Sequence, residues 1–139
     1  MKKFIRLILS LLLILSSLAM HAQSDYKVVF DFTSKDTNDQ KAVIRWLNEI
    51  SKGEPQAKME VVMYGQGFNL VHKDKSIVAS EVMRLAANKN ISFKVCAISL
   101  KNNNVDPSQL LAGVTTVPDG IYEVISKQHQ GWGYIKVKN

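Results

Sequence analysis

Apolar and polar residues alternate along the chain in blocks, and these blocks predict strands and helices in turn. Five short apolar runs, rich in β-branched and aromatic residues and bounded by turn-forming residues, have the pattern of strands. They are residues 26–32, 58–64, 91–100, 114–117 and 134–137. The run 91–100 lies between two groups of asparagines, and we expect it to be a strand buried on both faces.

The segments between these runs carry apolar residues at a spacing of three and four positions, which predicts amphipathic helices over 38–52, 76–88 and 118–128. The residues expected to face inward are Val43, Trp46, Leu47 and Ile50 in the first helix, Ile77, Val78, Val82, Leu85 and Ala86 in the second, and Ile121, Val124 and Ile125 in the third. The pair Asp106-Pro107 predicts an N-cap and the start of a short helix over 107–112.

Strand and helix alternate about five times with short connections. Parallel neighbouring strands need crossover connections, and helices supply most of them here, so the alternation predicts helices on both faces of a parallel sheet. The expected fold class is α/β: a three-layer α/β/α sandwich with a mostly parallel five-stranded sheet, flavodoxin-like in size. No internal repeat or domain linker is visible in the sequence.

The first residues have the anatomy of a secretory signal peptide. Basic residues at positions 2 and 3 precede an almost wholly apolar run over 4–19, and Ala22 provides a small residue at the expected cleavage point. We therefore expect residues 1–22 to be a signal peptide and 23–139 to form a single domain. No second long apolar stretch follows, so no stable membrane anchor is expected after cleavage.

Loss of the leader changes the charge of the chain. The formal net charge is +6, and removal of Lys2, Lys3 and Arg6 leaves +3 because no acidic residue goes with them. The remaining basic residues are scattered, whereas nucleic-acid binding needs a concentrated basic surface. We expect no nucleic-acid partner. The one cysteine, Cys96, excludes an internal disulfide.

Ligands of open parallel sheets bind beyond the carboxyl ends of the strands. The segments 33–36, 65–69, 96–104 and 117–120 follow predicted strands and are expected to meet at that rim. The candidate ligand-binding residues there are Gly65, Gln66, Gly67, Ser99, Pro118 and Gly120. The Gly65-Gln66-Gly67 loop lacks the third glycine and the downstream acid of a dinucleotide fingerprint, so no cofactor is predicted.

Other polar candidates are weaker. His72 and His129 have no spacing with Cys96 that matches a zinc site, so no metal is predicted, and His72 beside two lysines is expected at the surface. Asp31 and Asp36 lie at the end of the first strand, where Asp36 is more simply an N-cap.

Cys96 allows two interpretations. A reactive thiol needs a lowered pKa, which a helix N-terminus or a nearby cation can provide. Free cysteine is also among the most buried residue types, so Cys96 could equally be a small core residue between Val95 and Ile98.

Four stretches of the chain together resemble the DsrE/DsrF-like proteins of sulfur relay. They are residues 61–67 (VVMYGQG), 93–100 (FKVCAISL), 113–121 (GVTTVPDGI) and 130–135 (QGWGYI). The resemblance implies an α/β fold that assembles as a homotrimer or homohexamer. It also implies a strand-end cysteine that carries a persulfide, and Cys96 occupies that position.

Two functions follow as hypotheses. In the first, the chain is an exported sulfur carrier, at most sulfurtransferase-like. Its Cys96 accepts a sulfur atom from a donor and passes it to an acceptor, and each of these partners is a protein or a small thiol. In the second, it is a non-catalytic oligomeric module that binds a small ligand at the rim, with Cys96 in the core. The signal peptide predicts a periplasmic or secreted location in a bacterium.

Overall fold

The computed structural model describes Met1 and residues 25–138. The predicted signal peptide therefore lies, apart from Met1, outside the described residues. Within residues 25–138, no helix is long and apolar enough to cross a membrane.

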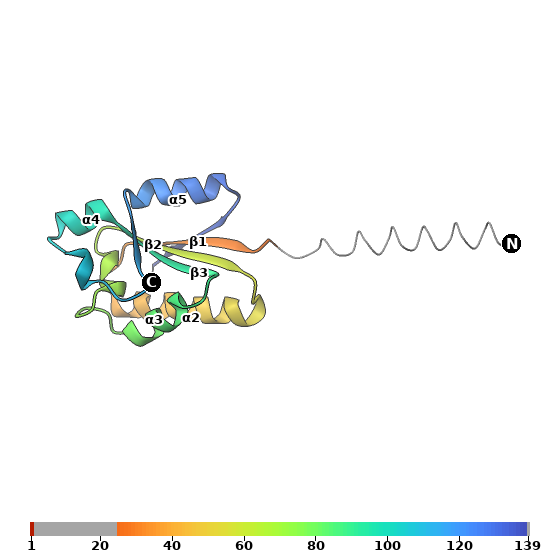
Figure 1. Ribbon diagram of the computed structural model, residues 1–139, viewed down its shortest axis with the longest axis horizontal. Helices are drawn as coiled ribbons and strands as arrows, with labels where there is room; N and C mark the ends of the chain where they lie inside the picture. The colour runs from red at the N-terminus through yellow and green to blue at the C-terminus, as the bar shows by residue number, and fades with distance from the viewer. Residues whose placement is uncertain (2–24, 139) are drawn as a thin grey trace.

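A sheet of five parallel strands forms the centre of the fold, in the order β4-β3-β2-β1-β5. The strands are β1 (Lys27–Phe32), β2 (Lys58–Met63), β3 (Ile91–Cys96), β4 (Thr115–Val117) and β5 (Gly133–Val137). Helices cover both faces, so the predicted α/β/α sandwich is confirmed, and the sheet is wholly rather than mostly parallel (Figure 1).

The helices divide between the two faces. The α-helices are α2 (Thr37–Gly53), α3 (Ala79–Ala86), α4 (Ala97–Asn102) and α5 (Gly120–His129). Two 3₁₀ helices are η1 (Gly67–Val71) and η2 (Pro107–Gln109). Figure 1 shows α2 and α3 below the sheet, and α4 and α5 above it. Asp36 caps α2 as expected, because its side chain accepts a hydrogen bond from the backbone N–H of Asn38 at 2.6 Å.

The two faces of the sheet are packed very differently. The face under α2 and α3 carries the main core, in which large side chains such as Phe30, Leu47 and Phe93 are fully buried. The face under α5 has a small apolar cluster of three buried valines, Val29, Val62 and Val124, with Trp132 packed against it. The α5 layer therefore contributes much less hydrophobic stabilisation than the α2 and α3 layer.

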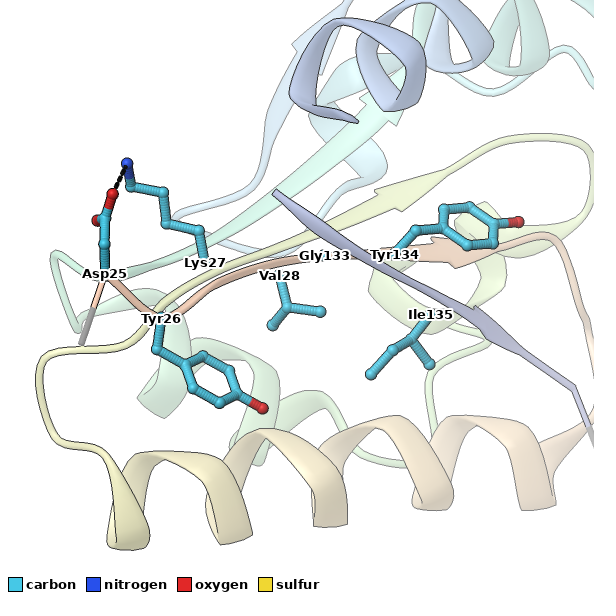
Figure 2. A pocket seen from close by; sticks show the side chains of 7 residues that line it. All are labelled: Asp25, Tyr26, Lys27, Val28, Gly133, Tyr134 and Ile135. Atoms are coloured by element: carbon cyan, nitrogen blue, oxygen red, sulfur yellow. Dashed lines mark hydrogen bonds and ion pairs between the residues drawn. The ribbon is translucent and has the colours of Figure 1, made fainter. Parts of the chain in front are cut away.

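Polar side chains fill most of the sheet surface on the α5 side. Paired residues of parallel strands point to the same face, so the register places two rows of side chains there. One row is Tyr134, Val29, Glu60 and Ser92, and the next is Lys136, Asp31, Val62, Lys94 and Thr115. Figure 2 shows the alternation on β5, where Tyr134 points away from α2 and Ile135 points toward it.

The predicted strand 91–100 is wrong beyond Cys96. The chain turns there from β3 into α4, which buries Ser99 and Leu100 and leaves Ala97 and Ile98 exposed. A continuous apolar run has the same appearance whether it continues as a strand or changes into a short helix. The predicted short helix over 107–112 is only a 3₁₀ helix, η2, over Pro107–Gln109.

The inward residues of α5 also differ from the prediction. Ile121 and Ile125 are 55% and 45% exposed, whereas Gly120 and Val124 are buried. Gly120, Val124 and Lys127 form the side of α5 that contacts the sheet, at spacings of four and three residues. This side of the helix is not purely apolar because the sheet surface under it is polar. Ile77 is exposed because α3 begins two residues later, at Ala79.

The prediction that His72 lies at the surface is wrong, because the residue is buried, with 4% of its surface exposed. Its Nδ1 accepts a hydrogen bond from the backbone N–H of Asp74 at 3.1 Å, and its ring lies 6.3 Å from that of Phe68. The neighbouring Lys73 and Lys75 are exposed, so the polar neighbours in sequence gave a misleading picture of His72.

Candidate functional site

The chain leaves the carboxyl ends of β2 and β3 toward opposite faces of the sheet. After β2 it continues to η1 and α3 on one face, and after β3 it enters α4 on the other. Ligands of parallel sheets bind near such a switch point. Here the backbone N–H of Gly65 donates a hydrogen bond to Ser99 Oγ at 2.8 Å, and Gln66 Nε2 donates to Asn103 Oδ1 at 2.7 Å.

Cys96 lies at this switch point, as the last residue of β3 and the N-cap of α4. Its side chain is surrounded by hydrogen-bond donors. The backbone N–H groups of Gly120, Ser99 and Ile98 and the hydroxyl of Ser99 are near enough to the sulfur to favour its thiolate, although the Cys96 side chain makes no capping hydrogen bond to α4. Two helix starts therefore converge on one thiol, since Gly120 opens α5 and Ile98 and Ser99 lie in the first turn of α4.

These donors lower the pKa of the Cys96 thiol. Burial is the largest single influence and would raise the pKa, because a charged sulfur loses its solvation. The four hydrogen bonds, of which that from Gly120 is the strongest, oppose burial and favour the thiolate, so the pKa of Cys96 lies below its ordinary value of 9.0. A lowered pKa is the property that separates reactive cysteines from inert ones.

Ser99 links the loop after β2 to the thiol. Its oxygen accepts the N–H of Gly65, which leaves its own hydroxyl proton free to point at the sulfur of Cys96. Ser99 is 8% exposed, and its hydrogen bond with the Gly65 N–H fixes the orientation of its side chain. Gly65 and Ser99, expected as ligand-binding residues, thus both contribute to the surroundings of Cys96.

Replacing Ser99 with alanine is expected to raise the pKa of Cys96, because the thiolate loses one hydroxyl donor. The measurement is the ultraviolet absorbance of the thiolate of folded protein across pH. Ser80→Ala, an exposed position on the opposite face in α3, is the matched control and should leave the titration unchanged. A Ser99→Ala titration identical to that of the wild type would contradict this role.

Gly120 is close enough to Cys96 that a side chain has no room. A Cβ atom on Gly120 would lie 3.1 Å from the Cβ of Cys96 and 3.2 Å from the Cβ of Tyr64. Both distances are shorter than an ordinary van der Waals contact. A glycine at this position lets the first N–H of α5 reach the sulfur.

The remaining predicted site residues are not among the groups that lower the pKa of Cys96. Gln66 is exposed at the rim, and Gly67 is buried where a Cβ atom would clash with the carbonyl oxygen of Phe32. Pro118 is exposed in the turn between β4 and the α5 N-cap, Asp119. The structure thus brings Gly65, Ser99 and Gly120 to the cysteine and leaves the other three candidates around it.

A polar network extends from Tyr64 across β1. Asp31 is buried and its Oδ2 accepts from the hydroxyls of Tyr64 at 3.0 Å and Tyr134 at 2.7 Å. Its Oδ1 is 2.8 Å from Lys136 Nζ, which also donates to Thr33 at 3.0 Å. The sequence placed Asp31 at the end of its strand, but its phenolic partners carried no local signal because they lie on other strands.

The two tyrosines of this network remain protonated. Burial, followed by the hydrogen bond to Asp31, raises the pKa of Tyr64 well above its usual value. The same hydrogen bond and a smaller effect of burial raise the pKa of Tyr134 to about 12. Both phenols therefore act as hydrogen-bond donors at physiological pH, and they hold the aromatic ring of Tyr64 beside Gly120.

A pocket of about 350 Å³ lies at the other end of the sheet (Figure 2). Residues at the amino ends of β1 and β5 line it, including Tyr26, Val28 and Ile135. Because the strands are parallel, this end is opposite to the one that carries Cys96, and ligands of such sheets favour the carboxyl end. Among the described residues, no group of three or more histidine, cysteine or acidic side chains is placed to hold a metal ion.

The fold is that of a small α/β protein with a buried free thiol at the end of an inner strand. The family model of the DsrE/DsrF-like family matches residues 13–137, so the chain belongs to that family. The family is generally related to sulfur relay. The resemblance drawn from the sequence motifs is therefore confirmed.

Solved structures with the same fold agree. MTH1491 from Methanobacterium thermoautotrophicum, described as a protein of unknown function, is 28% identical with a TM-score of 0.75, over 81% of this chain and 99% of its own. BT1422 from Bacteroides thetaiotaomicron, also described as of unknown function, is 16% identical with a TM-score of 0.66, over 84% of this chain and 98% of its own. The ychN protein of E. coli is 9% identical with a TM-score of 0.64, over 80% of this chain and 98% of its own. Comparison with curated proteins gives no match.

Proposed function

We propose that this chain is a sulfur carrier that holds a persulfide on Cys96. The property that supports the proposal most directly is the lowered pKa of the Cys96 thiol, which three backbone N–H donors and the Ser99 hydroxyl favour. Donors that favour a thiolate also favour the persulfide anion, which carries the same charge one atom further out. Membership of a family related to sulfur relay supports the same chemistry.

The proposed reaction is an exchange of one sulfur atom between thiols. The Cys96 thiolate attacks the outer sulfur of a donor persulfide, so that a new S–S bond forms at Cys96, the S–S bond of the donor breaks, and the donor leaves as a thiolate. An acceptor thiolate then attacks the outer sulfur on Cys96 and releases Cys96 as a thiolate. Neither step needs a cofactor or an external oxidant, because one S–S bond replaces another.

The test is to incubate the folded protein with a small-molecule persulfide and follow intact mass. We expect a mass increase of one sulfur atom, which a small acceptor thiol then removes. A protein that gains no sulfur when folded, but gains it after unfolding in urea, would overturn the proposal.

The alternative is a ligand-binding module with Cys96 in the core. The observation that favours it is the burial of Cys96, which is only 4% exposed. Alkylation of folded protein across pH separates the two functions. Labelling well below the ordinary pH range of a thiol supports the carrier, and labelling only after unfolding supports the module.

Two further parts of the proposal concern location and assembly. The apolar leader over 4–19 supports export to the periplasm or the medium, and a mature protein whose mass begins at Gln23 would agree. Ile98, Ile121, Tyr122 and Ile125 are exposed on α4 and α5 and support burial between copies of the chain as a homotrimer or homohexamer. Light scattering that gives a monomer would contradict the assembly.

A further inference from the structure

A buried carboxyl group lies under the middle of α5. Glu60, on β2, is 2% exposed. Its Oε2 accepts a hydrogen bond from Ser92 Oγ at 2.9 Å and lies 3.1 Å from Lys127 Nζ. Its Oε1 is buried and meets no hydrogen-bond donor within the described part of the chain. A charged carboxylate with one bare oxygen in this position is costly.

Glu60 has a second acid as a neighbour. Glu123, on α5, shares Lys127 with it, because Lys127 Nζ lies 3.1 Å from Glu60 Oε2 and 3.6 Å from Glu123 Oε1. Two carboxyl groups form a hydrogen bond only when one of them is protonated. One shared proton gives the pair a single negative charge, which Lys127 balances.

The same cluster anchors α5 to the sheet. Val124 is the only apolar side chain that α5 buries, and Lys127 extends from α5 to Glu60 with its ammonium group 4.6 Å from the centre of the Trp132 ring. Few hydrophobic contacts support this helix, so the charge balance of the cluster has a large share in holding it. The first residue of the same helix, Gly120, lies against Cys96, where a Cβ atom built on it would be 3.1 Å from the Cβ of Cys96.

We propose that the proton shared by Glu60 and Glu123 controls access to Cys96: with the proton present α5 stays closed on the thiol, and without it α5 loosens and opens the thiol to solvent. This inference names the regulation of the proposed sulfur-carrier site and rests on that function for its purpose, but not for its mechanism. It also accounts for how a thiol that is buried in the closed state can meet a partner.

The direction of the pH dependence follows from the environment of Glu60. Burial raises its pKa most, the hydrogen bond with Glu123 raises it further, and the charge of Lys127 and the Ser92 hydroxyl oppose them without reversing the result. The proton is therefore lost above the ordinary glutamate value of 4.5. Loss of this proton leaves two adjacent carboxylates against one lysine, and their repulsion weakens α5.

The other charged groups on this sheet face are further from the pair or already balanced. Asp31 on β1 is paired with Lys136 of β5 at 2.8 Å. Lys94 on β3 and Lys58 on β2 lie two positions along the strands from Ser92 and Glu60.

The test measures how fast iodoacetamide labels Cys96 of the folded protein from about pH 5 to about pH 8, with each rate divided by the measured thiolate fraction. In the wild type we expect the corrected rate to rise about fivefold, which corresponds to a loss of ~1 kcal/mol in the closing of α5. Glu60→Gln, which remains neutral at every pH, should give a flat profile at the low rate.

Two variants make the result specific. Glu123→Gln removes the partner acid from a partly exposed position and should also flatten the profile, which keeps the test available if Glu60→Gln fails to fold. Glu49→Gln changes an exposed acid on α2, on the other face of the sheet, and should keep the wild-type rise. Hydrogen exchange should show that the protection of residues 120–129 falls over the same pH range in the wild type and in Glu49→Gln, but not in Glu60→Gln or Glu123→Gln.

A flat wild-type profile, or a rise that persists in Glu60→Gln and Glu123→Gln, would overturn the inference. Sulfur loading is measured separately on the same samples. Loading with a flat labelling profile overturns only the pH control, and a pH-dependent profile without loading overturns only the sulfur-carrier function.

Discussion

Replacing Cys96 with serine is expected to abolish sulfur loading completely. Cys96 is the only cysteine of the chain, and a serine hydroxyl is not ionised at neutral pH and cannot form a persulfide. Serine is close to cysteine in size and can keep the hydrogen bonds from Gly120 and Ser99, so the fold should persist. The measurement is intact mass after incubation with a small-molecule persulfide, together with the urea unfolding midpoint of each protein.

The matched control moves the thiol instead of removing it. Ser80 is exposed on α3, so Cys96→Ser combined with Ser80→Cys carries one ordinary surface thiol on the same fold. We expect this protein to be alkylated more slowly than the wild type near pH 6, where an ordinary thiol is almost wholly protonated. If the relocated thiol loads and transfers sulfur as well as Cys96 does, the surroundings of Cys96 have no chemical role.

The architecture was predictable because its signals are local and repeated. Apolar runs between turn-forming residues fixed four strands to within a residue or two of each observed end, and their alternation with helices required a parallel sheet. The end of β3 was not predictable in the same way. Leu100 and Val95 are both buried, and nothing in the periodicity of the run shows that the backbone becomes helical between them.

The surroundings of the thiol were predictable only in part. Parallel strands put Cys96 and the segment 117–120 at one rim, which correctly predicted their proximity. The hydrogen bond from Gly120 depends on how close α5 comes to the sheet, and that closeness follows from contacts of Val124 and Lys127 far along the helix. Glu60 did leave a signal, because it is the one acid inside the apolar run 58–64.

Burial and activation of Cys96 have a common origin in α5. The helix that excludes water from the sulfur also delivers the N–H group that lowers the thiol pKa, so a change that moves α5 away should expose the thiol and make it less acidic together. This coupling distinguishes the site from a surface cysteine, in which exposure and pKa are set by separate neighbours.

Gly120→Ala is expected to uncouple the thiol from α5. The new methyl group would lie 3.1 Å from the Cβ of Cys96 and 3.2 Å from that of Tyr64, so the first turn of α5 must shift outward. The N–H of residue 120 then loses its bond to the sulfur, and the pKa of Cys96 rises toward that of a free thiol. A hydrogen bond to a charged group contributes ~1.5 kcal/mol or more, so alkylation and sulfur loading near neutral pH should slow about tenfold.

The pH dependence of alkylation separates this effect from simple destabilisation. In Gly120→Ala the rate curve should move to higher pH and reach at least the wild-type plateau, because the less stabilised thiolate is the stronger nucleophile. The overpacked site should also lower the free energy of unfolding by ~1–3 kcal/mol. Gly53→Ala, at the end of α2 where a Cβ meets no atom within 4 Å, is the control and should change neither quantity appreciably. If the rate curve of Gly120→Ala coincides with that of Gly53→Ala, the N–H of Gly120 does not stabilise the thiolate, and the activation of Cys96 must come from Ser99 and Ile98 alone.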